Sequence, residues 1–144
     1  MDSQSLTAVV SVITSGIIAI LSVIFPLINL LTEKARLERE IKASESKNLN
    51  EITNHLLNNL ADFLSGNVSS ATKDSIEKAK SSIISSFYAW ERVVRQRLDV
   101  SERIDIKNLR REFELGDQIS LFHMGPDLVD RILETTDLVL DRIK

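Results

Sequence analysis

The residues best suited to chemistry are cations gathered near one tyrosine in the second half of the chain. Tyr88, Arg92 and Arg95 are spaced i, i+4 and i+7, which places them on one flank of a helix. Further cations follow at Arg103, Lys107, Arg110 and Arg111. If the two segments fold against each other, they form a positive surface with an aromatic ring for stacking a base. The sequence therefore predicts an anion-binding site for a nucleotide-type ligand, RNA or acidic lipid headgroups.

The same charges have a simpler interpretation. Glu91 and Arg95, Arg95 and Asp99, and Arg110 and Glu114 are each one helical turn apart. Such pairs neutralise one another on an exposed helix face and contribute little stability. The alternative to a ligand site is therefore a solvated face of internally paired charges.

Signs of enzymatic or metal chemistry are absent from the sequence. Cysteine is missing, and the two histidines, His55 and His123, belong to no paired metal-ligand spacing. Glycine-rich phosphate loops and nucleophile elbows are also missing. We expect no enzyme activity, no metal and no cofactor. The net charge of -3 does not favour duplex DNA as a partner.

The element that must position this chemistry begins the chain. Residues 6–31 contain no charge, and as a helix they would extend roughly 39 Å, against about 30 Å of bilayer hydrocarbon. A soluble core helix seldom stays apolar for so long without a polar face. We predict a transmembrane helix at residues 6–31, preceded by a short external N-terminus at residues 1–5.

The charges beside this span predict its orientation. No cation precedes it, whereas four follow within a short stretch: Lys34, Arg36, Arg39 and Lys42. Because Lys and Arg near a span remain on the cytoplasmic side, we expect residues 33–144 in the cytoplasm. The prediction is a single-pass protein of the inner membrane, with the bilayer as its first partner.

Small polar residues lie along one side of the predicted span. Thr7, Ser11 and Ser15 are four apart, and Ser22 and Asn29 continue at intervals of seven. Such residues let helices approach closely and hydrogen-bond across the contact, which predicts a homo-oligomer. Two alternatives remain: the hydroxyls bond back to their own helix, or they line a water-filled pore.

The rest of the chain is predicted to be mostly all-α. We expect a charged stalk at residues 32–48, with a hinge at residues 44–48, and a helical domain at residues 49–144. Within the domain, an amphipathic helix at residues 49–64 would end at Gly66. A long central helix would begin at Ser69, Ser70 or Thr72 and continue to Leu98, with Trp90 in its core stripe rather than serving as a stacking platform.

The last part of the chain is less regular in pattern. A short helix is expected at residues 105–114, followed by a segment, residues 117–123, that fits a strand or a turn equally well. A final helix would open at Gly125 and Pro126, since proline suits the first helical position. Its apolar residues repeat at helical spacing to the end of the chain.

The layout as a whole resembles a known group of proteins. One N-terminal span, a basic stalk and a small cysteine-free helical domain with an arginine-rich region resemble the small membrane effectors of bacterial antiviral signalling, especially those that accompany type III CRISPR systems. The resemblance implies a cytosolic domain that binds a cyclic oligonucleotide and a membrane part that then acts on the bilayer. It carries over no individual binding residue.

Two other functions fit the same layout. A passive scaffold would hold the helical domain at the membrane for a partner protein, and would show exposed apolar surface and no response to nucleotides. A holin-like pore former would damage membranes through its span alone.

Overall fold

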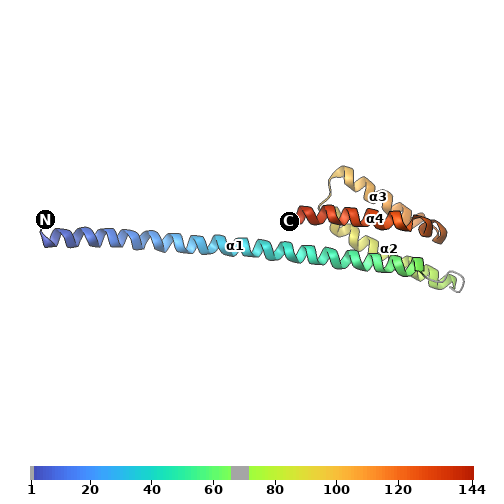
Figure 1. Cartoon of the computed structure of the whole chain (residues 1–144), viewed down its shortest axis with the longest axis horizontal. Helices are drawn as coiled ribbons and strands as arrows, with labels where there is room; N and C mark the ends of the chain where they lie inside the picture. Colours follow the sequence, from blue (N-terminus) through green and yellow to red (C-terminus); the bar gives the residue numbers. More distant parts are fainter. Residues whose placement is uncertain (1, 66–71) are drawn as a thin grey trace. The chain divides into compact units, whose positions relative to one another are not determined.

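The computed structural model describes residues 2–65 and 72–144, and all regular structure in these residues is helical (Figure 1). The elements are α1 (Ser3–Ser65), α2 (Lys73–Arg95), α3 (Val100–Leu115) and α4 (Gln118–Ile143). They form two compact units, Met1–Ile41 and Lys42–Lys144. The all-α prediction is confirmed.

The first unit is the N-terminal part of α1. Among the described residues, α1 is the one helix long and apolar enough to cross a membrane. Its apolar stretch is not buried against any other part of the protein. Val12, Val23 and Leu30, for example, are about 70% exposed (72%, 67% and 68%). This exposure argues against a soluble core helix and is consistent with a single-pass membrane protein.

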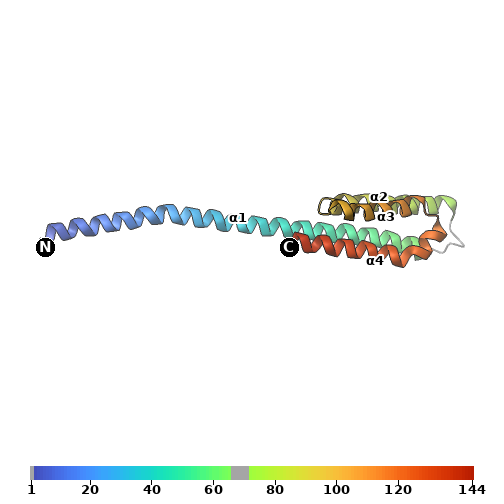
Figure 2. The same cartoon turned by 90° about the horizontal axis from the view of Figure 1, so that it is seen from above.

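The second unit is a four-helix arrangement of the rest of α1 with α2, α3 and α4. In Figure 2, α2 and α3 lie in one layer, while α4 lies beside the end of α1 in the other. Apolar side chains at helical spacing fill the space between the layers, as the periodicity predicts. The buried apolar positions include Leu49, Leu56, Leu60, Phe63, Ile83, Phe87, Trp90, Val94, Leu98, Ile106, Leu109, Phe113, Leu128, Ile132, Val139 and Ile143.

Trp90 packs in this core, as expected, and is bound there by a hydroxyl. Its indole Nε1 donates to the Thr136 hydroxyl at 3.0 Å, and that hydroxyl lies 3.2 Å from the Thr53 hydroxyl. Thr136 also reaches the Ile132 carbonyl at 2.8 Å. This buried contact joins α1, α2 and α4, so it fixes the three helices in one register.

The predicted hinge is wrong. Residues 44–48 lie inside α1, which continues without a break to Ser65. The polar composition of this segment is weakly helical, but tertiary contacts hold it: Glu45 pairs with Arg97 of the α2–α3 turn at 2.7 Å, and Leu49 is fully buried. Tertiary packing overrides local propensity here.

Helix α3 begins before the expected residue 105, and α2 ends at Arg95, before the expected Leu98. Helix α3 starts at Val100, because Asp99 and Glu102 form a capping box: Glu102 N–H donates to Asp99 at 2.9 Å, and Asp99 N–H to Glu102 at 2.8 Å. Leu98 therefore lies in the turn after α2, although its side chain is buried.

The last helix also begins earlier than expected. Asp117 caps it through the Ser120 N–H at 2.7 Å, so the ambiguous segment 117–123 is helical and Pro126 lies inside α4. Gly125 permits close packing there, since an added Cβ would lie 2.7 Å from a methyl group of Leu64. The predicted stop at Gly66 and the possible starts at Ser69 and Ser70 lie outside the described residues, and Thr72 is the N-cap of α2.

The capping box makes the stability of α3 sensitive to acid. The Glu102 N–H holds the pKa of Asp99 below its usual value of 3.8, and Arg142 holds the pKa of Glu102 below 4.5. Both shifts stabilise the fold above the unfolded-state pKa values, and the stabilisation disappears as pH falls through the folded-state values. We expect Asp99→Asn, which keeps the capping oxygen, to reduce the fall in melting temperature between about pH 5 and pH 2. Melting curves with an unchanged pH slope would contradict this.

Candidate anion-binding groove

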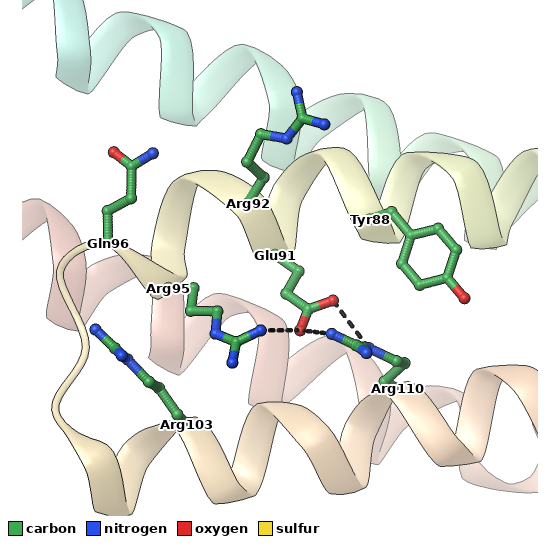
Figure 3. A pocket seen from close by; sticks show the side chains of 7 residues that line it. All are labelled: Tyr88, Glu91, Arg92, Arg95, Gln96, Arg103 and Arg110. Atoms are coloured by element: carbon green, nitrogen blue, oxygen red, sulfur yellow. Dashed lines mark hydrogen bonds and ion pairs between the residues drawn. The ribbon is translucent and has the colours of Figure 1, made fainter.

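Most of the predicted cations meet in a shallow groove between the C-terminal half of α2 and helix α3 (Figure 3). Its volume is about 420 Å³. Helical spacing brings α2 residues to one wall, and the α2–α3 turn folds α3 back to supply the other. The lining residues are Tyr88, Glu91, Arg92, Arg95, Gln96, Arg103 and Arg110.

A second hollow of about 400 Å³ adjoins the first. Arg95 and Arg103 border both, and the second adds Lys107 with the exposed apolar side chains of Val100 and Ile104. Glu91 and Arg110 also line both hollows, so their common boundary holds three guanidinium groups and one carboxylate.

Not every predicted residue belongs to this arrangement. Arg111 is exposed on α3 and lines neither hollow. Arg92 lies at the rim, and its guanidinium group points away from Glu91 in Figure 3. The groove thus combines six of the seven predicted ligand residues, with Arg95, Arg103 and Lys107 as its best-placed cations.

Glu91 is the acidic residue of the groove, and sequence reasoning assigned it only to Arg95. It is 6% exposed. Arg110 binds it with two nitrogens, Nε at 3.0 Å from Oε2 and Nη2 on Oε1, while Arg95 Nη1 lies 4.0 Å from Oε1. The hydrogen bond to Glu91 raises the pKa of Arg110. Arg110 is therefore largely neutralised by a carboxylate on the neighbouring helix.

The predicted pairing of charges holds in part. Glu91 and Arg95 do lie within ion-pair distance. Among the residues that the structure describes, however, Arg110 pairs with Glu91 rather than Glu114, and Asp99 serves as the cap of α3 instead of pairing with Arg95. The interpretation as a fully paired surface is thus too simple.

Tyr88 offers less stacking surface than the sequence suggests. Its hydroxyl donates to Glu114, and this hydrogen bond raises the pKa of the phenol. The Arg110 guanidinium carbon lies 5.7 Å from the ring centroid, a cation–π contact. The ring is thus engaged within the protein by Arg110, and the residue remains 44% exposed.

The remaining cations carry charge that no close acid balances. Within residues 2–65 and 72–144, no carboxylate lies within ion-pair distance of Arg92, Arg103, Lys107 or Arg111. Arg103 donates through Nε to the Leu98 carbonyl at 3.0 Å, which orients it toward the groove wall. The local balance is positive, although the whole chain is acidic.

The sequence did not predict that Glu91 and Gln96 line the groove. Glu91 follows Phe87 by four residues, so it falls at the edge of the core stripe of α2 and turns toward α3. That register was visible in the sequence. Its pairing with Arg110 depends on how α3 folds back, which local spacing does not reveal.

The polar stripe of the N-terminal helix is solvent-exposed in the structure. Two of its five residues bond to their own helix: Thr7 donates to the Ser3 carbonyl at 2.8 Å and Ser22 to the Ala19 carbonyl at 2.7 Å. Self-association through this stripe stays a prediction.

No set of three or more His, Cys, Asp or Glu side chains in the described part of the chain could hold a metal ion. Comparison of the chain with protein-family models, with curated proteins and with solved structures finds no match.

Proposed function

We propose that this chain is a single-pass membrane effector whose helical domain binds an anionic ligand of the oligonucleotide type in the α2–α3 groove. The observation that carries the proposal is the convergence of Arg95, Arg103 and Lys107 around two adjoining hollows, with Glu91 already paired to Arg110. Guanidinium groups in such a cluster suit bidentate binding of phosphates.

The topology of the proposal follows from charge near the span. The cations at residues 34–42 support an orientation with the domain in the cytoplasm and the N-terminus outside the inner membrane. A ligand shared between subunits would bind the assembled state more tightly than the separate chains. It would therefore shift the population toward an oligomer in which the polar stripes of the spans meet.

The test uses the full chain in nanodiscs. Calorimetry measures its binding to cyclic and linear oligonucleotides, and the mass of the assembly is measured on the same samples. We expect saturable binding that weakens as salt is raised, because the ligand releases counterions. An increase in assembly mass with bound ligand would support the coupling to oligomerisation. Absence of binding at low salt would refute the proposal.

A scaffold is the second candidate, and one feature favours it. Three large apolar side chains at the α3–α4 corner are exposed: Leu115 (81%), Ile119 (68%) and Phe122 (57%). Exposed apolar groups clustered on a small domain are typical of a surface for another protein. A scaffold would bind such a partner without any response to nucleotides.

A further inference from the structure

The end of the helical domain at which α1 enters is built from three helices. Lys42 Nζ lies 3.3 Å from the Lys144 carbonyl, and Arg97 Nη2 lies 2.7 Å from Glu45. These contacts place the end of α4 and the α2–α3 turn beside the first turns of α1 within the domain. The first turns of α3 therefore belong to the same end.

Two apolar side chains are exposed there among cations. Val100 is 78% and Ile104 57% exposed, and both line the second hollow with Arg103 and Lys107. They follow one another by four residues, so they share one side of α3. Exposing aliphatic side chains to water costs free energy. The aliphatic stems of neighbouring Arg and Lys side chains can lie along an apolar surface while their charged ends stay in a polar layer.

Chain length limits how far this end can lie from the bilayer. Residues 32–41 separate the apolar stretch from the domain, which is roughly 15 Å of helix. The headgroup layer occupies about 5–8 Å of that distance. Helix tilt and the length of arginine and lysine side chains can bridge the rest.

We propose that the α2–α3 end of the domain docks on the anionic headgroups of the cytoplasmic leaflet. Val100 and Ile104 enter the interfacial region, while Arg103 and Lys107 contact lipid phosphates. Attraction of the two cations to an anionic surface and burial of the two aliphatic side chains both favour docking, and the tether spares most of the cost of association. The inference rests on the proposed single-pass topology. It does not need the proposed ligand, but Arg103 and Lys107 also border the proposed ligand groove, so lipid and ligand would compete for these two cations.

The cysteine-free sequence allows a direct measurement. A nitroxide spin label is attached to Val100→Cys in the full chain, reconstituted in vesicles of phosphatidylcholine with or without phosphatidylglycerol. The matched control is Leu115→Cys, which is 81% exposed at the other end of α3. We expect collisions of the label at position 100 with a water-soluble nickel complex to fall about three- to fivefold when the anionic lipid is present. The label at position 115 should not respond.

A charge reversal tests the role of the cations. In the Val100→Cys background, Arg103→Glu with Lys107→Glu should restore nickel access to the value in zwitterionic vesicles. Equal access at positions 100 and 115 in anionic vesicles would overturn the proposal. So would protection of position 100 by dissolved oligonucleotide in zwitterionic vesicles with no response to phosphatidylglycerol, because the surface would then be a ligand subsite. Calorimetry with oligonucleotides tests the proposed ligand, and nickel access tests membrane docking, so one proposal can fail without the other.

Discussion

Replacing Arg95 and Arg103 together by glutamate is expected to weaken the proposed oligonucleotide binding strongly. Both guanidinium groups border the two hollows of the groove, and both side chains are exposed, so their loss leaves the core intact. A hydrogen bond to a charged group contributes about 1.5–3 kcal/mol, and reversal adds repulsion. The dissociation constant should rise at least about 100-fold, as measured by calorimetry on the full chain.

The control variant changes the net charge by the same amount, but at two positions outside the groove. Lys73→Glu with Arg111→Glu alters two exposed cations that line neither hollow. We expect this variant to bind within about threefold of the parent at physiological salt, because screening weakens distant charges. If both double variants lost affinity equally, binding would depend on overall charge, and the groove would not be the site. Circular dichroism of both variants verifies that each remains folded.

Trp90→Ala is expected to cause the largest loss of stability. The indole is fully buried, packs 5.5 Å from the Phe87 ring and donates to Thr136. Truncating a buried tryptophan costs about 3–5 kcal/mol, a large part of the 5–15 kcal/mol that stabilises a typical domain. Urea unfolding of the full chain in detergent, followed by circular dichroism, measures the free energy of unfolding.

Tyr88→Ala is the matched control for this loss. It removes a ring from the same helix, but Tyr88 is 44% exposed, and the change removes its hydrogen bond to Glu114 and its cation–π contact with Arg110. We expect a cost of about 1 kcal/mol or less. Equal losses in the two variants would contradict the placement of Trp90 at the centre of the core.

The core was predictable because burial repeats with the helical period. Leu49, Leu56 and Leu60 in α1, and Ile83, Phe87 and Trp90 in α2, lie where the pattern places them. The helix starts were harder. Several polar residues near each start can act as a cap, and the choice of Asp99 and Asp117 depends on the turn that tertiary packing allows.

The two clearest errors have the same origin. Residues 44–48 and Pro126 both carry local signals for a break, yet each lies inside a helix that packing stabilises on either side. The groove shows what local spacing does not predict. Spacing along α2 predicted that Tyr88, Arg92 and Arg95 share one side of the helix. The pairing of Arg110 with Glu91 forms between two helices and has no local signature.

The position of Trp90 has a practical consequence. It is the one tryptophan in the chain, and the single tyrosine, Tyr88, stands two residues away. Intrinsic fluorescence excited at the indole band therefore reports on the helical domain and not on the N-terminal span. Because Glu91 follows directly and lines the groove, a ligand that displaced its carboxylate from Arg110 would alter the field at the neighbouring indole. The natural sequence thus contains its own optical reporter, positioned between the core and the site.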